Sequence, residues 1–288
     1  MSTMQPPQKT AFVFPGQGAQ FTGMGKELYS SSPAAKKVFD ALAAIKPDLL
    51  TLCFEGTKEE LSLTINTQPC IFAVSMANAA ALTEQGIKPV AVAGFSLGEV
   101  CALTFSGVLS REDGFKAVIK RAEFMTECAS KSKGSMSAVL KLETAALENL
   151  AKTHGVYPVN YNCPGQIVVS GEADKMAEFN TAVGTNGGRA IPLAVSGAFH
   201  SPLMNEASKN FREFLDTLTL NSPTIPVYAN ATASEYPKDL KELKDLFASQ
   251  ISNPVRWEQT VKNMKAASIE AFIELEPGKV LTGLIAKI

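Results

Sequence analysis

The sequence predicts an α/β fold, in which a parallel sheet with covering helices carries a smaller inserted α/β part. Three observations indicate this fold. Short apolar runs of strand length alternate with segments of helical spacing along the chain. Pro and Gly mark the junctions between these segments. From about Gly134 the predicted order changes to β-α-β-β-α-β, and the earlier pattern resumes at Gly197.

The predicted first part supplies a strand and two helices. Residues 11–14 form a short apolar strand that runs into the turn sequence PGQG, and residues 33–42 have helical spacing. A long helix, almost all apolar or small, is predicted to start at Pro69 and to end at Gly86. A helix of that composition is expected to lie buried beneath a sheet.

The next strand leads into a candidate nucleophile. Residues 90–93 are apolar, and Gly94-x-Ser96-x-Gly98 follows directly, before a helix-compatible segment. In a nucleophile elbow the serine sits on a sharp strand-to-helix turn, and small flanking residues let the backbone pass closely. Ser96 is therefore the candidate nucleophile, and Leu97, whose N–H begins the helix, is a candidate oxyanion donor. The alternative is an ordinary tight turn.

Gln17 follows the first strand as Ser96 follows the second. The carboxyl ends of parallel strands meet at one edge of the sheet, where ligands and catalytic residues collect. The segment GQGAQ at residues 16–20 lacks the Lys-Ser/Thr of a phosphate-binding loop. Its glycines are expected to bring a backbone N–H close to a reacting carbonyl.

The inserted part is predicted to be a compact ferredoxin-like subdomain of residues 134–196, so that residues 1–133 and 197–288 form the large domain. Its strands are expected at residues 136–140, 156–162, 166–170 and 190–195, and its helices at 145–153 and 173–183. After it, helices are expected at residues 204–218 and 240–251 and strands at 227–230 and 269–275. A cleft between the two parts is the expected small-molecule site.

The chain offers two histidines as a general base. His154 precedes Gly155 at an expected helix end, where an exposed histidine is favourable to the dipole. His200 lies in a loop of small residues and proline that returns from the insertion. A serine nucleophile needs a base that titrates near neutral pH, which predicts His200 for that role. The alternative is a structural loop histidine.

Composition excludes several classes of protein. The chain has 288 residues, 45% of them hydrophobic, which permits a sizeable core. The formal net charge is -1 and Lys and Arg are spread evenly, so we expect no nucleic-acid partner. No apolar stretch reaches the roughly 18 residues of a membrane span, so we expect a non-secreted cytoplasmic protein without a membrane partner. Five scattered cysteines without C-x-x-C spacing indicate reduced thiols and no zinc site.

Five motifs, in order, resemble those of the malonyl-CoA:acyl-carrier-protein transacylase family, which includes the acyltransferases of fatty-acid and polyketide synthesis. They are FPGQGAQ at residues 14–20, GFSLGE at 94–99, IKRAEFM around Arg121, GAFHS at 197–201 and SQISNPVRW around Gln250. The resemblance covers almost the whole chain. It implies an α/β-hydrolase-like core with an inserted ferredoxin-like subdomain.

The resemblance also implies roles for the site residues. Ser96 would carry the acyl group, His200 would be its base, and Gln17 and Leu97 would be the backbone oxyanion donors. Arg121 would anchor the free carboxylate of the substrate, because its planar fork binds a carboxylate through two charge-assisted hydrogen bonds. The alternative for Arg121 is a surface arginine on a helix that also carries lysines.

The main-chain carbonyl of Gln250 would orient the histidine in place of the acid of a triad. A neutral carbonyl stabilises imidazolium less than a carboxylate does, but a thioester is already an activated acyl donor. In the resembling polyketide acyltransferases, a phenylalanine at the position of Phe199 accompanies a preference for malonyl over methylmalonyl groups, and a bulky ring there is expected to crowd a branched α-carbon. Such crowding discriminates by roughly 1 to 3 kcal/mol.

Two features depart from the family pattern. Phe95 stands where histidine is usual, which removes a polar group beside the nucleophile and leaves the breadth of acyl substrates open. The chain ends at Ile288, somewhat earlier than is usual, which predicts a trimmed terminal helix.

The implied reaction is transfer of a malonyl group from malonyl-CoA to the phosphopantetheine thiol of a holo acyl carrier protein, through a malonyl-serine. Phosphopantetheine and CoA arrive as parts of the substrates, so we expect no cofactor and no metal, and a monomer suffices. One alternative is an acyl hydrolase that clears carrier proteins, for which Arg121 would have no use. Another is a non-catalytic carrier-docking subunit, which Ser96 and His200 disfavour.

Overall fold

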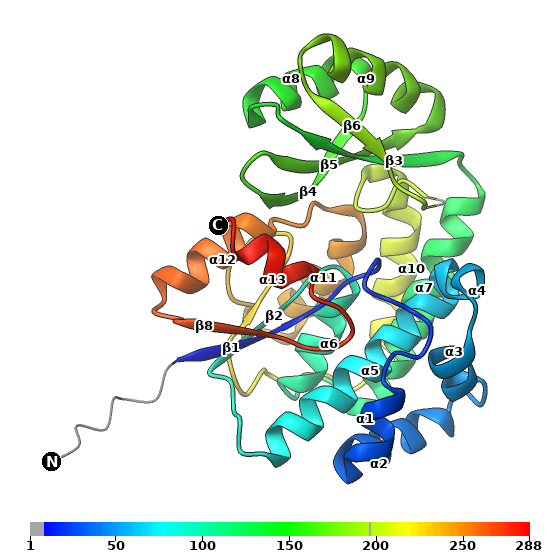
Figure 1. Cartoon of the computed structure of the whole chain (residues 1–288), viewed down its shortest axis with the longest axis vertical. Coiled ribbons are helices and arrows are strands. Elements are labelled where there is room, and N and C mark those ends of the chain that lie inside the picture. The colour runs from blue at the N-terminus through cyan, green and yellow to red at the C-terminus, as the bar shows by residue number, and fades with distance from the viewer. Residues whose placement is uncertain (1–8, 196) are drawn as a thin grey trace, which may run out of the picture.

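The computed structural model describes residues 9–195 and 197–288. Figure 1 shows a larger lobe around a central parallel sheet and a smaller lobe, above it in that view, around a second sheet. The predicted α/β fold with a parallel sheet is confirmed.

The large sheet has the strand order β7-β2-β1-β8, and its neighbouring strands pair in parallel. Its strands are β1 (Thr10–Phe14), β2 (Ala91–Gly94), β7 (Val227–Tyr228) and β8 (Ala271–Glu274). Alternate residues of β1 enter different cores, because side chains of a strand point to opposite faces. Phe12 and Phe14 join one core, and Ala11 and Val13 join a second core with Trp257.

Helices cover both faces of this sheet (Figure 1). Those before the second sheet are α1 (Lys26–Ser31), α2 (Pro33–Ala43), α3 (Leu49–Glu55), α4 (Lys58–Ser62), α5 (Thr64–Glu84), α6 (Leu97–Phe105) and α7 (Arg111–Ser130). Those after it are α10 (Asn205–Leu215), α11 (Leu240–Ser249), α12 (Trp257–Ala266) and α13 (Val280–Ile285), with short 3₁₀ turns η1 (Pro202–Met204) and η2 (Gln250–Ser252).

The predicted start of the long helix at Pro69 is wrong, because α5 begins at Thr64 and contains Pro69. The N–H groups of Asn66 and Thr67 both donate to the Leu63 carbonyl at 2.8 Å, which closes the first turn. Proline lacks an N–H and removes one bond of the ladder. The helix continues through it because the surrounding residues 67–77 are buried in the main core, and packing outweighs the lost bond.

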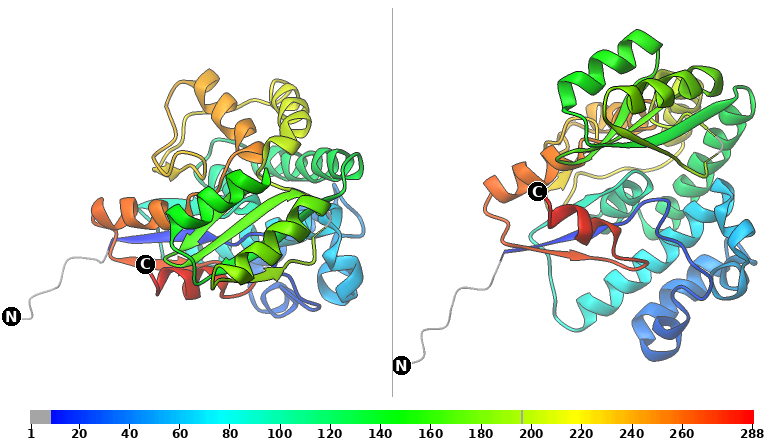
Figure 2. Two further views of the ribbon diagram at one scale, coloured as in Figure 1. Left: turned by 90° about the horizontal axis from the view of Figure 1, so that it is seen from above. Right: turned by 45° about the horizontal axis from the view of Figure 1, so that its top comes forward.

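The second sheet is antiparallel and has the order β4-β5-β3-β6. Its elements are β3 (Gly134–Leu140), α8 (Thr144–His154), β4 (Tyr157–Cys163), β5 (Gln166–Glu172), α9 (Ala173–Thr185) and β6 (Arg189–Pro192). This β-α-β-β-α-β order, with the third strand between the first and second, is ferredoxin-like. Figure 2 shows α8 and α9 together over the outer face of the sheet. The predicted boundary at residue 134 coincides with the start of β3, and residue 196 lies outside the described residues.

Main-chain hydrogen bonds join the two lobes. The N–H of Tyr161 in β4 donates to the carbonyl of Val255 at 2.9 Å, and the N–H of Val255 donates to the carbonyl of Val159 at 2.7 Å. Val255 follows η2 by three residues. The segment after η2 therefore pairs with the edge strand β4 of the small sheet. This pairing fixes η2, which belongs to the large lobe, relative to the small lobe.

All five cysteines are buried free thiols. Across the described ranges, none of the helices combines the length and the apolar character that a bilayer span requires.

Candidate active site

Ser96 occupies the sharp turn between β2 and α6. Its backbone has φ 54° and ψ -110°, a conformation that residues other than glycine rarely adopt. A Cβ at Gly98 would lie 2.2 Å from the Phe14 carbonyl oxygen, and one at Gly94 would lie 1.9 Å from the carbonyl of Gly98. Both glycines are therefore required by close backbone approach, which is the physical basis of the G-x-S-x-G pattern.

Ser96 and His200 form a hydrogen-bonded pair. Oγ of Ser96 lies 2.8 Å from Nε2 of His200. The other ring nitrogen, Nδ1, lies 2.9 Å from the carbonyl oxygen of Gln250 and 3.2 Å from that of Asn253. Carbonyl oxygens only accept, so Nδ1 carries the proton and Nε2 accepts from the serine hydroxyl. This tautomer is the one that a general base for Ser96 needs.

His200 is buried, and its pKa is lowered to about 4, chiefly by that burial. The positive charge of Arg121 contributes to this lowering, and the carbonyls of Gln250 and Asn253 oppose it. His200 is therefore neutral near pH 7 and able to take a proton.

Arg121 projects from α7 into the same cluster and is only 1% exposed, which excludes the surface alternative. Its Nη1 donates to Oε1 of Gln68 at 2.8 Å. Its Nη2 donates to Oε1 of Gln250 at 2.9 Å and to Oγ of Ser96 at 3.1 Å. Burial lowers its pKa to about 10, which leaves it protonated at neutral pH.

The partners of Arg121 are all uncharged. Within the residues that the structure describes, the guanidinium makes no ion pair with a carboxylate, and its Nε has no hydrogen-bond partner. A buried cation without a contacting anion is costly. The guanidinium of Arg121 is therefore suited to bind a carboxylate group of a ligand that enters beside Ser96.

Gln17 and Leu97 line the cavity at Ser96. Among the hydrogen bonds of residues 9–195 and 197–288, none uses the main-chain N–H of either residue. The loop of Gln17 passes close to the elbow, since a Cβ at Gly16 would lie 2.7 Å from the Phe95 carbonyl oxygen. Both N–H groups are thus free to face an oxyanion near Ser96.

The cavity around Ser96 and His200 has a volume of about 90 Å³. Its other walls include Gln17, Gln68, Phe95, Met125, Asn160 and Phe199. A groove of about 620 Å³ adjoins this cavity and shares the lining residues Gln17, Leu193 and Val195 with it. The small cavity fits a short acyl group, and the groove has the size for a longer arm attached to it.

The two phenylalanines form apolar walls. Phe95 packs edge-to-face on Trp257, with ring centroids 5.7 Å apart, so its ring is held by the large lobe. Phe199 is buried directly before His200. A Cβ at Gly197 would lie 2.7 Å from the Phe199 ring, so a larger residue at position 197 would displace the ring.

A family model described as "Acyl transferase domain" matches residues 11–287 of the chain. The chain belongs to this acyl transferase family. It is 42% identical over 287 residues to a protein of Bacillus subtilis named malonyl CoA-acyl carrier protein transacylase, covering 97% of this chain and 90% of the relative. The Escherichia coli protein of the same name is 38% identical over 285 residues, covering 96% and 92%.

Solved structures of the family have the same fold. The malonyl CoA-acyl carrier protein transacylase of Clostridium perfringens superposes with a TM-score of 0.93 at 36% identity, covering 97% of this chain and 90% of that one. A malonyl-transacylase in complex with a type II polyketide acyl-carrier protein superposes with a TM-score of 0.94 at 33% identity, covering 98% and 93%.

The structure brings the predicted residues of this acyl transferase into one cluster, as contacts or cavity walls: Gln17, Phe95, Ser96, Leu97, Arg121, Phe199, His200 and Gln250. His154 lies elsewhere, at the end of α8, with its ring edge-to-face on Phe179. Within the described ranges, His, Cys, Asp and Glu residues form no group of three or more placed to hold a metal ion.

Several polar residues of the cluster were not predicted from the sequence. Gln68 holds Arg121, Asn253 adds a second acceptor for His200, and Asn160 lines the cavity with a buried Oδ1 that lacks a partner among the described residues. Asn230 binds the peptide groups on both sides of Phe95, directly before the nucleophile. A polar residue in an apolar helix was the signal for Gln68, and the carboxyl end of a strand was the signal for Asn230.

Proposed function

We propose that this acyl transferase moves a malonyl group from malonyl-CoA to the phosphopantetheine thiol of a holo acyl carrier protein, in fatty-acid or polyketide synthesis. The observation that carries the proposal is Arg121, a buried cation with uncharged partners, 3.1 Å from the nucleophile oxygen. The names of the relatives, and the carrier complex of one structural neighbour, support the same reaction.

The first half-reaction forms a malonyl-serine. Oγ of Ser96 attacks the thioester carbonyl carbon, and its proton passes to Nε2 of His200. The carbonyl electron pair moves to oxygen, where the N–H groups of Gln17 and Leu97 stabilise the charge. The carbon–sulfur bond then breaks, and CoA leaves as a thiol with the proton from His200.

The second half-reaction transfers the malonyl group to the carrier and regenerates the free Ser96 hydroxyl. The carrier thiol gives its proton to Nε2 of His200 and attacks the ester carbonyl. The bond to Oγ breaks, and Ser96 recovers the proton from the imidazolium. The same donors face the second oxyanion. These steps use side chains and main-chain N–H groups of one chain and the two substrates, so a monomer suffices and neither a metal nor a bound cofactor has a part in them.

Arg121 selects the acyl group in this scheme. The malonyl carboxylate replaces the uncharged partners of the guanidinium and binds it through paired charge-assisted hydrogen bonds. An acetyl group offers no such partner, so it gains nothing from the buried cation. The carboxylate also fixes the thioester relative to Ser96, which is the positioning that a transfer reaction needs.

The test is the intact-protein mass after brief incubation with malonyl-CoA, acetyl-CoA or methylmalonyl-CoA, followed by holo carrier protein. We expect a malonyl adduct that needs Ser96 and moves to the carrier. The Ser96→Ala variant is the matched control and should remain unmodified. No malonyl adduct would overturn the assignment, and an adduct lost to water in the presence of carrier would favour an acyl hydrolase.

A further inference from the structure

We propose that Asn230 is a positioning residue, whose side-chain amide holds the nucleophile Ser96 and the support of its base in one fixed arrangement. The proposal rests on the transfer function proposed above. Asn230 follows β7 and is completely buried. It is not among the cavity walls, so it acts through other residues and not on the substrate.

The amide of Asn230 brackets the turn at Ser96. The N–H of Ser96 donates to Oδ1 of Asn230 at 2.8 Å, and Nδ2 of Asn230 donates to the carbonyl of Gly94 at 2.6 Å. One planar group thus binds the peptide groups on both sides of Phe95, immediately before the nucleophile. A strained backbone such as that of Ser96 persists only when its surroundings hold it.

The same amide reaches the residue that orients the base. Nε2 of Gln250 donates to Oδ1 of Asn230 at 3.1 Å and to the carbonyl of Ser96 at 2.7 Å. The carbonyl of Gln250 in turn accepts from Nδ1 of His200. Oδ1 of Asn230 is therefore shared by the segment that carries the nucleophile and the segment that fixes the imidazole.

A buried carboxyl group also binds the main chain of Asn230. The N–H of Asn230 donates to Oε2 of Glu99 at 2.6 Å, and the hydroxyl of Tyr236 donates to Oε1 of Glu99. Glu99 lies in the first turn of α6, the helix that begins at the nucleophile. The carbonyl of Asn230 accepts from the N–H of Arg256, next to the segment that bonds with the small sheet. Asn230 is thus held on both sides of its main chain.

The consequence is a selective defect. Without the amide, Ser96 is free to leave its strained conformation, and Gln250 loses its bond to Asn230 and keeps only its bond to the Ser96 carbonyl at the elbow. The cavity walls and Arg121 keep their places, so substrate binding should persist while attack slows. A misplacement of about 1 Å can cost on the order of 100-fold in rate.

Asn230→Ala tests this arrangement through two rates and one affinity. We expect the rate of malonyl-serine formation to fall by about 100-fold. Labelling of Ser96 by a fluorophosphonate should fall with it. The dissociation constant for malonyl-CoA, measured by calorimetry in the Ser96→Ala background, should change by less than about twofold. Ser75→Ala removes a buried hydroxyl whose bond to the Glu276 carbonyl lies outside this network, and it should leave both rates unchanged.

The outcomes are distinct. A wild-type labelling rate in folded Asn230→Ala, or a loss of malonyl-CoA affinity that matches the loss of rate, would overturn the positioning role. If Asn230→Ala does not fold, Asn230→Leu decides on the same criteria, because it keeps the approximate size of the side chain and removes both the acceptor for Ser96 and Gln250 and the donor to Gly94. If the wild-type protein takes up no malonyl group, the proposed function fails, and the fluorophosphonate rates still decide the role of Asn230.

Discussion

Nη2 of Arg121 donates to Oγ of Ser96 at 3.1 Å, while Nε2 of His200 lies 2.8 Å from the same oxygen. The nucleophile therefore sits between a cation and a base. The cation lowers the pKa of the base, and a substrate carboxylate that binds Arg121 offsets that charge. In the proposed reaction, substrate recognition and base strength are therefore coupled through one guanidinium.

Arg121→Ala should reduce malonyl transfer far more than acetyl transfer. The lost interaction is a buried pair of charge-assisted hydrogen bonds, so we expect malonyl kcat/KM to fall by about 100-fold or more. Lys120→Ala, which removes an exposed side chain of the same helix paired with Glu123, is the control and should leave both rates unchanged. Equal losses for the two acyl groups would contradict the carboxylate-anchor role.

The pH dependence should show the lowered pKa of His200. Transfer requires the neutral imidazole, so activity is present above the pKa of His200 and is lost as the pH falls through about 4. The acid limb of kcat/KM, which reports the free enzyme, should lie there and not near 6.5. The limb of kcat should lie higher, since the bound carboxylate offsets Arg121. Stopped-flow acylation across pH 3.5–8 measures the acid limbs of kcat/KM and of kcat. Coincident limbs near 6.5 would contradict the effect of Arg121 on the pKa of His200.

Glu99 should give stability a pH dependence. Burial raises its pKa from 4.5 to about 7, so its proton favours the folded state. That contribution is fully present below pH 4.5 and is lost as the pH rises through about 7. Glu99→Gln removes this dependence. We expect the free energy of unfolding of Glu99→Gln, relative to the wild type, to rise by about 3 kcal/mol between pH 5 and 8. Urea unfolding at the two pH values measures it, and a constant difference would argue against the raised pKa.

Phe199→Ala should widen the acyl cavity beside His200. Removal of the ring makes room for a branched α-carbon, and a methyl group in a hydrophobic pocket is worth about 1–3 kcal/mol. The ratio of methylmalonyl to malonyl loading should therefore rise by about tenfold or more. Competition between the two CoA esters, read by intact mass, measures this ratio. An unchanged ratio would assign the preference to another wall of the cavity.

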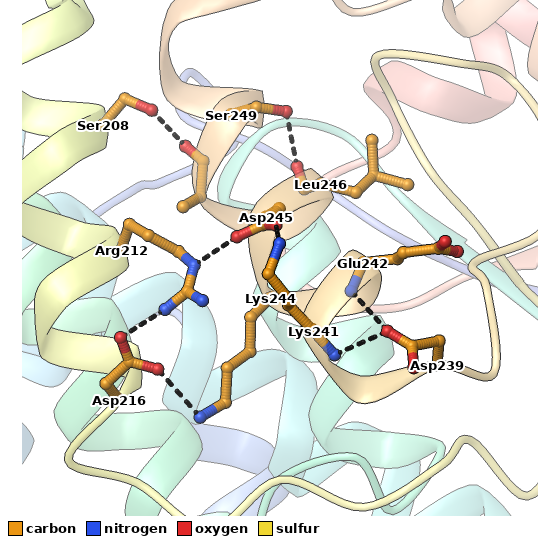
Figure 3. A network of polar contacts seen from close by, with 11 residues as sticks. Ser208, Arg212, Asp216, Asp239, Lys241, Glu242, Lys244, Asp245, Leu246 and Ser249 are labelled. Atoms are coloured by element: carbon orange, nitrogen blue, oxygen red, sulfur yellow. Dashed lines mark hydrogen bonds and ion pairs between the residues drawn. The ribbon is translucent and has the colours of Figure 1, made fainter.

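The α10–α11 network should stabilise the helices next to the catalytic loop. Arg212 pairs with Asp216 and Asp245, and Lys244 and Lys241 pair with the same two carboxylates (Figure 3). Arg212→Ala should lower the Tm in low salt, and by less in 1 M NaCl, because the two carboxylates are about half exposed and salt screens their pairs. Lys262→Ala, which breaks one isolated exposed pair, is the comparison. An equal change in Tm for both variants would show that the network stabilises the protein no more than one isolated pair does.

Local patterns of the sequence predicted much of the fold. Strand and helix periodicity placed the β-α-β-β-α-β insertion, and G-x-S-x-G placed the strand, turn and helix around Ser96. Both depend on neighbours in the chain, where spacing and backbone freedom are readable. The start of α5 was missed because a proline normally begins a helix, and only the burial of residues 67–77 shows why the helix continues through it.

The sequence by itself determined the chemistry of this protein: a serine in an elbow, two candidate bases and an arginine within family motifs. Only the tertiary structure decided that Gln68 and Gln250 hold Arg121 without a carboxylate, and that Asn230 joins Ser96 to Gln250. The pairs Gln68–Arg121 and Ser96–Asn230 are 53 and 134 residues apart in the chain. Such contacts leave no local period or spacing, because they arise where strand ends and helices from distant segments pack at one edge of the sheet.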